Sequence, residues 1–330
     1  MIAEVGLSHE GSLGIAKAFV DAIAGTGVDA VKFQTHIPEA ESTEREAFRV
    51  KVFPQDATRP DYWRRTGFNA REWFELAEYS RERELVFLSS PFSETAVDLL
   101  MDCRVPAWKV ASGEICNTPL LERMAETGLP VLLSSGMSSW SELDAATRVL
   151  RQCRIPFGIF QCTSAYPCPP ESWGLNVVQE MARRYACPVG LSDHSGTVAP
   201  SLASVTIGAS MLEFHVTFHK QMFGPDVLAS LTIEETESLV GMVRNLECAF
   251  ANPVDKDHVA EHSSSMRRLF SKSIVAAHPI PAGTILDRSH LAFKKPGDGI
   301  PAGNYSLVLG RRSKSDLAID QRILESDLHE

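Results

Sequence analysis

The chain has 330 residues, a net charge of −10 and a hydrophobic content of 44%, values that are ordinary for a folded globular protein. The negative charge argues against general nucleic-acid binding, although a few local cations are enough to bind a small anion. No apolar run approaches the ~20 residues that a membrane span requires. The seven cysteines are scattered without a CxxC pair, and the first residues do not resemble a secretion leader. We therefore expect a cytoplasmic protein that binds neither nucleic acid nor membranes.

Short apolar segments alternate with amphipathic ones through the first part of the chain. Eight segments have the length and composition of strands, at 2–6, 28–34, 85–89, 106–111, 130–134, 156–162, 188–192 and 210–215. Segments between them, such as 12–27 and 118–128, repeat apolar residues at helical spacing and close with Gly27 and Gly128 as C-cap glycines. Eight alternating units predict an α/β fold, a (β/α)8 TIM barrel over residues 1–250.

Two regions break this alternation. Residues 35–68 are rich in proline and charge and follow the second predicted strand, so we expect them to form a lid over the active site. Residues 251–268 are polar without a period, and we interpret them as a linker. Residues 269–330 carry short Val, Ile and Leu runs broken by Pro-Ala-Gly turns, which predict a small β-rich domain. A domain of about 60 residues is marginally stable alone, so we expect it to dock on another surface.

Polar residues end every predicted strand. The active site of a (β/α)8 barrel forms at the carboxyl ends of its strands, so these residues are expected to meet there. Lysine charge and short hydroxyl donors suit the oxygens of a phosphate. The side chains that would form such a phosphate site are Lys32, Ser90, Lys109, Ser112, Ser134 and Ser192. Each residue taken alone has a structural explanation, as a helix cap or a paired core group, but their number favours a site.

The last predicted strand contains two polar residues, Glu213 and His215, which share one face because side chains alternate along a strand. His194 follows the neighbouring strand, so one divalent ion could join both imidazoles and keep positions open for water and substrate. Glu114, Asp193 and Glu213 are candidates for orienting ligands or transferring protons. We predict Glu114, Glu213 and His215 as catalytic residues.

The ordered motifs of the chain resemble those of the sialic acid synthase family, which condenses phosphoenolpyruvate with an N-acetylated amino sugar to give a nine-carbon 2-keto acid. The motifs that carry the resemblance are IAEVGLSHEG, GVDAVKFQTH, LSSPFS, PAWKVASGEICNTPLL, QCTSAYPCP, VGLSDHSG, LEFHVTF and GPDVLAS. The tail, with SIVAAHPIPAGTI and KKPGDGI, resembles the family's C-terminal SAF, or antifreeze-like, domain. In such enzymes this domain reaches over the barrel mouth of the other subunit, which implies a domain-swapped homodimer.

The resemblance implies a role for each matching residue. Phosphoenolpyruvate would bind to Lys32, Ser90, Lys109, Ser112, Ser134, Ser164 and Ser192. One Mn²⁺ or Mg²⁺ ion would bind to His194 and His215. The open-chain sugar would bind to Glu4, Gln34, Tyr166, Asp226 and Lys295. In the implied mechanism the metal polarises the sugar aldehyde, C3 of phosphoenolpyruvate attacks it, water adds at C2, and phosphate leaves by C–O cleavage.

Two positions depart from the family pattern. Phe214 stands where many relatives have a basic residue, and because it lies on the strand face opposite Glu213 and His215, it should affect barrel-to-helix packing more than the metal. Lys295 stands where sialic acid synthases typically present Arg to the N-acetyl end of the sugar, and Lys lacks the planar fork of donors. The acceptor therefore stays open among N-acetylmannosamine and legionaminate-type, pseudaminate-type or other amino sugars.

Two other functions remain open. A Schiff-base aldolase acting on pyruvate could use Lys32 or Lys109, because a lysine desolvated beside another cation can act as a nucleophile. Such an enzyme needs neither His194 nor His215. A non-catalytic sugar-binding relative could also retain the fold, although costly buried charges would then have no reason to persist. His219 lies beyond the last predicted strand, and we expect it to be a loop residue without a role.

Overall fold

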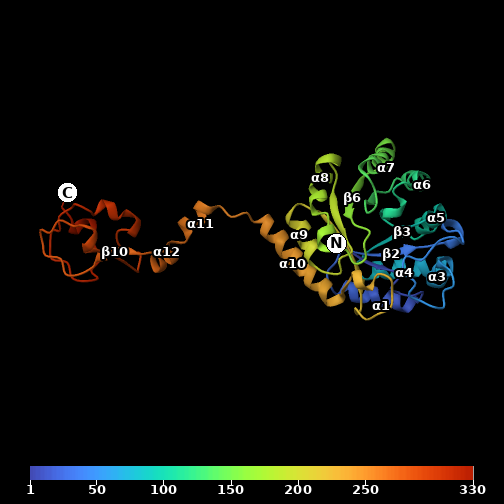
Figure 1. The fold of residues 1–330 in the computed structure, drawn as a ribbon, viewed down its shortest axis with the longest axis horizontal. Coiled ribbons are helices and arrows are strands. Elements are labelled where there is room, and N and C mark those ends of the chain that lie inside the picture. Colours follow the sequence, from blue (N-terminus) through green and yellow to red (C-terminus); the bar gives the residue numbers. More distant parts are fainter. Residues whose placement is uncertain (330) are drawn as a thin grey trace. The chain divides into compact units, whose positions relative to one another are not determined.

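The computed structural model describes residues 1–329 and divides the chain into two compact units, Met1–Ala251 and Asn252–Glu330. In the first unit, helices surround a parallel barrel of eight strands (Figure 1). This arrangement confirms the predicted (β/α)8 TIM barrel. Among the helices of residues 1–329, none is long and apolar enough to cross a membrane.

The barrel strands agree with the eight predicted segments to within a few residues. They are β1 (Ile2–Gly6), β2 (Ala30–Thr35), β3 (Val86–Pro91), β4 (Trp108–Val110), β5 (Val131–Ser134), β6 (Phe157–Cys162), β7 (Val189–Asp193) and β8 (Met211–Thr217). Parallel ladders join them in the order β3-β2-β1-β8-β7-β6-β5-β4, and β3 lies beside β4. A short additional strand, β9 (Ser230–Thr232), pairs with β8 and was not predicted, because three residues are too few to show an alternation.

Several helices of the first unit begin at a residue whose side chain caps them. They are α1 (Leu13–Ala24), α2 (Pro38–Glu41), α3 (Arg59–Thr66), α4 (Ala70–Glu82), α5 (Glu94–Asp102), α6 (Thr118–Glu126), α7 (Trp140–Gln152), α8 (Leu175–Tyr185), α9 (Ala199–Thr206) and α10 (Ile233–Ala251). The side chains of Ser12 and Ser93 cap α1 and α5 by accepting backbone N–H groups. The predicted cap at Gly27 is wrong, because Gly25 is the C-cap of α1, whereas Gly128 follows the C-cap of α6 with φ of 75°.

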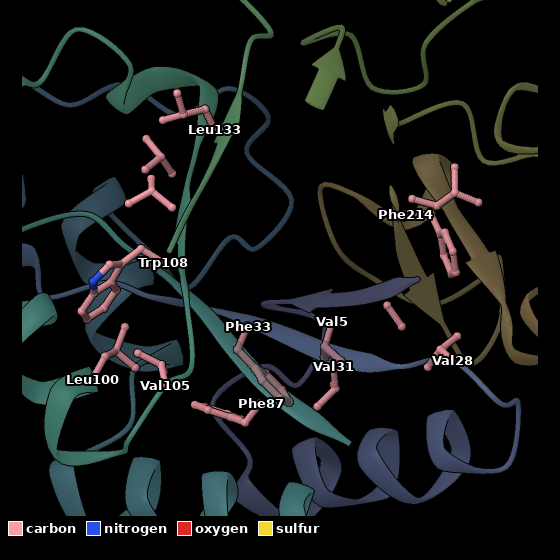
Figure 2. Packing of buried hydrophobic residues seen from close by; sticks show 14 of the residues in the cluster. Val5, Val28, Val31, Phe33, Phe87, Leu100, Val105, Trp108, Leu133 and Phe214 are labelled. Atoms are coloured by element: carbon pink, nitrogen blue, oxygen red, sulfur yellow. The ribbon is translucent and has the colours of Figure 1, made fainter. Parts of the chain in front are cut away.

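Side chains on the outer face of the strands pack against the helices. Val31 and Phe33 of β2 and Phe87 of β3 lie on the side of their strands that faces the helices (Figure 2). Trp108 and Phe214 belong to the same hydrophobic cluster and are fully buried. The predicted packing role of Phe214 is therefore confirmed.

Side chains on the inner face of the strands change from apolar to polar along the barrel. A separate apolar cluster inside the barrel is formed by Ile2, Ala30, Leu88 and Phe160. Two residues further along β1 and β2, Glu4 stands opposite Lys32 in the parallel register. Because alternate residues point inward, the same apolar-to-polar step occurs around the barrel, and a polar layer lies directly on the apolar one.

The insertion between β2 and α4 is more ordered than its sequence suggested. It contains α2 and α3, and α3 starts with a capping box in which Thr58 and Asp61 bond reciprocally. Tyr62 and Trp63 of α3 form a small hydrophobic cluster with Leu7, and this cluster is separate from the main core. The insertion is therefore a packed element with its own apolar contacts.

The second unit has its own core. Its strands β10 (Ser273–Ala276) and β11 (Leu291–Lys294) pair antiparallel, and isolated bridges extend the pairing to other segments of the unit. The buried residues include Ile274, Ile280, Leu286, Val308, Leu317 and Ile323. Two short helices, α11 (Lys256–His262) and α12 (Ser264–Phe270), occupy most of the segment that we interpreted as a linker. Neither helix buries a residue, and seven residues each are too few to show a helical repeat in the sequence.

Candidate active site

A cavity of about 350 Å³ is lined by residues from all eight barrel strands or the loops that follow them. Most of the predicted site residues line it together, namely Glu4, Lys32, Gln34, Ser90, Lys109, Ser112, Ser134, Ser164, Tyr166, Ser192, His194, Glu213, His215 and Asp226. Inward alternation along each strand explains why residues so distant in sequence share one layer. The roles of these residues in binding and catalysis remain predictions.

A network of four buried charges forms the floor of the cavity. The ammonium group of Lys32 pairs with Glu4 and lies 3.9 Å from the carboxylate of Glu213. The ammonium group of Lys109 lies 3.2 Å from Glu213 and donates to Ser134 at 2.5 Å. All four charged side chains are at most 7% exposed. Two cations and two anions therefore compensate one another away from solvent.

Burial and the neighbouring charges shift the pKa values in this network in opposite directions. Burial alone would raise the pKa of Glu213, but the ammonium groups of Lys109 and Lys32 hold that pKa well below its usual range. Burial lowers the pKa of Lys109 despite the attraction of Glu213. For Lys32, the charges of Glu213 and Glu4 outweigh burial and raise the pKa. Glu213 is the carboxylate that both lysines depend on.

Serine hydroxyls converge beside the lysines. Ser90 accepts from Lys32 at 3.3 Å, and Ser192 donates to Glu213 at 3.0 Å. Ser112 and Ser164 flank Gly136, where a Cβ atom would lie 2.4 Å from both hydroxyl oxygens. Glycine at this position therefore lets two hydroxyls and a backbone N–H group approach the same space. This collection of donors suits a phosphate or carboxylate group.

The two histidines predicted as metal ligands lie close together in the cavity. The rings of His194 and His215 have centroids 5.4 Å apart, and both line the cavity. The Nδ1 atom of His194 lies 2.9 Å from the carbonyl oxygen of Thr163, so Nδ1 carries the proton and Nε2 has a free lone pair. Burial lowers the pKa of His215, which favours the neutral imidazole that binds metals. The residues present therefore fit a divalent ion.

The sugar-binding candidates of the first unit are held by contacts with neighbouring side chains. Gln34 donates to Glu4 at 2.9 Å. Asp226 forms an ion pair with Arg49, and the guanidinium group of Arg49 lies 4.2 Å above the ring of Tyr166. Arg49, which comes from the insertion, therefore contacts both Asp226 and Tyr166, two residues that the resemblance assigns to the sugar.

Sequence reasoning missed several lining residues. Phe48, Arg49, Arg59 and Tyr62 of the insertion line the cavity, and no periodic pattern shows which insertion side chains point inward. Cys162 also lines it, with its sulfur 3.6 Å from the Ser112 hydroxyl. Counting in steps of two along the predicted strand 156–162 would have placed Cys162 on the inner face with Phe160.

Glu114, a predicted catalytic residue, does not line this cavity. It ends a 3-10 turn at Ser112–Glu114 and lines a neighbouring cavity of about 550 Å³. Asn117 donates to its carboxylate at 2.7 Å. Burial, together with the charge of Glu41, raises the pKa of Glu114. The stacked rings of His36 and Trp63 belong to the lining of both cavities, so the two cavities share these aromatic side chains.

Asp193 and His219 of the first unit do not line this cavity. Asp193 is buried and accepts from the backbone and hydroxyl of Ser195, so it shapes the loop after β7. Lys295 belongs to the second unit, where its ammonium group lies 5.0 Å above the ring of Phe270. His219 is exposed beyond β8, as expected of a loop residue.

Removing the shared carboxylate should destabilise the barrel. Glu213→Gln leaves two buried ammonium groups with one carboxylate, and we expect it to lower the free energy of unfolding by about 3 kcal/mol in urea titrations. The double variant Lys109→Met with Glu213→Gln should recover part of that loss, because the surplus charge is gone. Glu78→Gln, which removes an exposed pair with Arg81, serves as the control and should change the free energy by less than about 1 kcal/mol. An unchanged urea midpoint for Glu213→Gln would show that Glu213 does not compensate the buried charges of the two lysines.

Comparison with known proteins identifies the family. Residues 19–255 match the NeuB family, and residues 271–329 match the SAF domain. The chain is 33% identical to N-acetylneuraminate-9-phosphate synthase of Homo sapiens, covering 98% of this chain and 91% of that one. It is 30% identical to N,N'-diacetyllegionaminic acid synthase of Campylobacter jejuni, covering 98% of each.

Among solved structures, the chain is similar to N-acetylneuraminic acid synthetase of Leptospira borgpetersenii in complex with citrate. The TM-score is 0.71 and the identity is 30%, over 81% of this chain and 92% of that one. The relatives are synthases of nonulosonic acids. The chain belongs to the NeuB family and carries a C-terminal SAF domain.

Proposed function

We propose that this protein is a nonulosonic acid synthase. It condenses phosphoenolpyruvate with an open-chain N-acetylated amino sugar, and releases phosphate and a nine-carbon 2-keto acid. The observation that carries the proposal is the set of two buried lysines and converging serine hydroxyls beside two facing imidazoles in one cavity. The named activities of the synthase relatives support it.

The phosphate and carboxylate of phosphoenolpyruvate would bind beside the two lysines and the converging serine hydroxyls. Lys32 and Lys109 supply positive charge there, and Ser90, Ser134 and the Ser112–Ser164 pair supply short donors. Glu213 holds both ammonium groups in place before the substrate enters. Because the donors are fixed by ion pairs and strand geometry, little reorganisation is needed when charge develops on the departing phosphate.

The aldehyde end of the acceptor would face the two histidines. A divalent ion, Mn²⁺ or Mg²⁺, bound by His194 and His215 would polarise the aldehyde oxygen as a Lewis acid. Glu4, Gln34 and Asp226 offer acceptors and donors for the sugar hydroxyls. Tyr166 stacks on His194 with ring centroids 4.0 Å apart and holds that imidazole in orientation.

The reaction balances as follows. C3 of phosphoenolpyruvate forms a bond to the aldehyde carbon, water adds its oxygen to C2, and one proton of that water ends on the new hydroxyl group. The bond between C2 and the bridging oxygen then breaks, and C2 becomes the keto carbon. Phosphate leaves with the bridging oxygen and takes up the second proton of the water, and Lys32 and Lys109 neutralise its charge.

The Schiff-base aldolase is the second candidate, and one observation favours it. Burial lowers the pKa of Lys109, which is the direction that an amine nucleophile requires. The same ammonium group is held by Glu213 at 3.2 Å and by Ser134, and these contacts favour its charged form. Borohydride reduction in the presence of pyruvate separates the candidates, because only the aldolase yields a covalent lysine adduct.

Turnover should require both the metal and its ligands. Chelator-stripped protein given phosphoenolpyruvate and a panel of acetamido sugars should consume phosphoenolpyruvate only after Mn²⁺ or Mg²⁺ is restored. His215→Ala should lower kcat by about 1,000-fold or more, since Lewis-acid stabilisation contributes several kcal/mol. His219→Ala, in the exposed loop beyond β8, is the matched control and should retain full activity. Normal turnover by His215→Ala, or none with any sugar, would refute the proposal.

The position of bond cleavage gives an independent test. With ¹⁸O in the bridging oxygen of phosphoenolpyruvate, C–O cleavage should deliver the label to the released phosphate, as measured by mass spectrometry. Unlabelled phosphate would show P–O cleavage and contradict the proposed route. The same reaction with unlabelled phosphoenolpyruvate sets the background of natural ¹⁸O.

We also propose a domain-swapped homodimer, in which Lys295 of the partner subunit approaches the acceptor. The proposal rests on the resemblance of the second unit to the SAF domain. Light scattering coupled to size exclusion should give about twice the chain mass of 36.3 kDa. A particle of single-chain mass at assay concentrations would contradict it.

A further inference from the structure

Three potential metal ligands lie on one face of helix α11, in the second unit. His258, Glu261 and His262 are spaced three and four positions apart, so their side chains are neighbours on the surface of the helix. The sequence HVAEH fits the pattern H-x-x-E-H, in which two histidines one helical turn apart bind zinc. One ligand atom from each of the three residues lies within 4.8 Å of the others. These residues line neither of the two cavities described above.

The hydrogen bond of His262 prepares its ring for a metal. The Nδ1 atom of His262 lies 2.9 Å from the carbonyl oxygen of His258, and because this oxygen can only accept, Nδ1 carries the proton. In the neutral ring, Nε2 then keeps the lone pair that a metal ion needs, and the hydrogen bond orients the ring. The ring of His258 lies beside it, with ring centroids 4.1 Å apart. The carboxylate of Glu261 adds negative charge that attracts a cation.

Helix α11 lacks the packing that stabilises most helices. It has seven residues, and none of them is buried. Isolated helices of this length are marginal in water, because most helical stability in proteins comes from a packed apolar face. The side chain of Asp255 caps the start of α11 by accepting the backbone N–H groups of Asp257 and His258. A metal ion bound to His258 and His262 would hold the next turn closed.

We propose that α11 binds one Zn²⁺ ion through His258, Glu261 and His262, and that this ion stabilises the helix. The site is separate from the barrel histidines and does not rest on the proposed function. Two imidazoles favour zinc over Mn²⁺ or Mg²⁺, which prefer oxygen ligands. Because all three ligands are exposed, water completes the coordination of the ion, and no surrounding walls hold a substrate. The role of the ion is therefore structural.

Rotation of the exposed side chains completes the geometry. The ligand atoms of a tetrahedral zinc site with bonds of about 2.1 Å are about 3.4 Å apart. The ligand atoms of α11 start within 4.8 Å of one another, and their exposed side chains can turn toward a common centre without displacing a neighbour. Three protein ligands bind more weakly than the four of a closed structural site, so we expect a Kd on the order of 10 µM.

Zinc titration against a chromophoric chelator tests the site. The full-length protein with His215→Ala is used, so that the barrel no longer offers two imidazoles to the ion. We expect one Zn²⁺ per chain, held about 100-fold more weakly after the further change His258→Ala and about tenfold more weakly after Glu261→Gln. His219→Ala removes an exposed histidine of the first unit and should leave the Kd unchanged. Equal zinc binding with and without His258, or no binding in this range, would overturn the inference.

Hydrogen exchange measured by mass spectrometry tests the stabilising role on the same proteins. Zinc at about 100 times its Kd should slow the exchange of the amides of residues 259–262 about 100-fold, because opening of the helix would have to release the ion. The exchange of α10 serves as the internal reference and should not respond to zinc. In the protein that also carries His258→Ala, the same zinc should leave α11 unchanged. Bound zinc without slower exchange in α11 would contradict the structural role.

Discussion

The buried pairing of two lysines with two glutamates inside the barrel is the interaction on which the site depends. Lys32 lies on β2 and Lys109 lies on β4. The carboxylate of Glu213, on β8, reaches both ammonium groups. An isolated charge at this depth would be prohibitively costly. Four charges that sum to zero can be buried, and they hold two cations ready for an anionic substrate.

Strand alternation accounts for the layering around this network. Ile2 and Ala30 belong to the apolar layer inside the barrel, and the inward residues two positions further on are Glu4 and Lys32. The apolar layer excludes water from one side of the charges, which strengthens their mutual attraction. The other side faces the cavity, where the proposed substrates would complete the electrostatic balance. Stability and the proposed substrate binding therefore depend on the same side chains.

The sequence was sufficient to predict whatever follows from alternation. All eight barrel strands and the polar rim at their ends depend on residues spaced by two, so Glu213 and His215 could be assigned to the cavity without a structure. The insertion could not be treated in this way. Arg49 meets Asp226, 177 positions away, through a packing arrangement that no local pattern encodes.

The predictions for Glu114 and for the segment of α11 failed because no repeating pattern covers these residues. Glu114 lies in a 3-10 turn after β4, where the rule of alternation no longer applies, and its side chain lines the neighbouring cavity. The polar helix α11, Lys256–His262, has no apolar stripe and was interpreted as a linker. Phe214, in contrast, lies within a strand, and its outward position followed directly from that of Glu213 and His215.

The proposed function requires one barrel cavity to hold a divalent ion and the phosphate of phosphoenolpyruvate side by side. Crystals of the full chain soaked with Mn²⁺ and phosphoenolpyruvate, and measured at the manganese absorption edge, test it most directly. We expect an anomalous peak at the Nε2 atom of His194 and the imidazole of His215, with phosphate density beside Lys32 and Lys109. Manganese bound only at the exposed His258 and His262 of α11, with no phosphate density in the barrel, would contradict it.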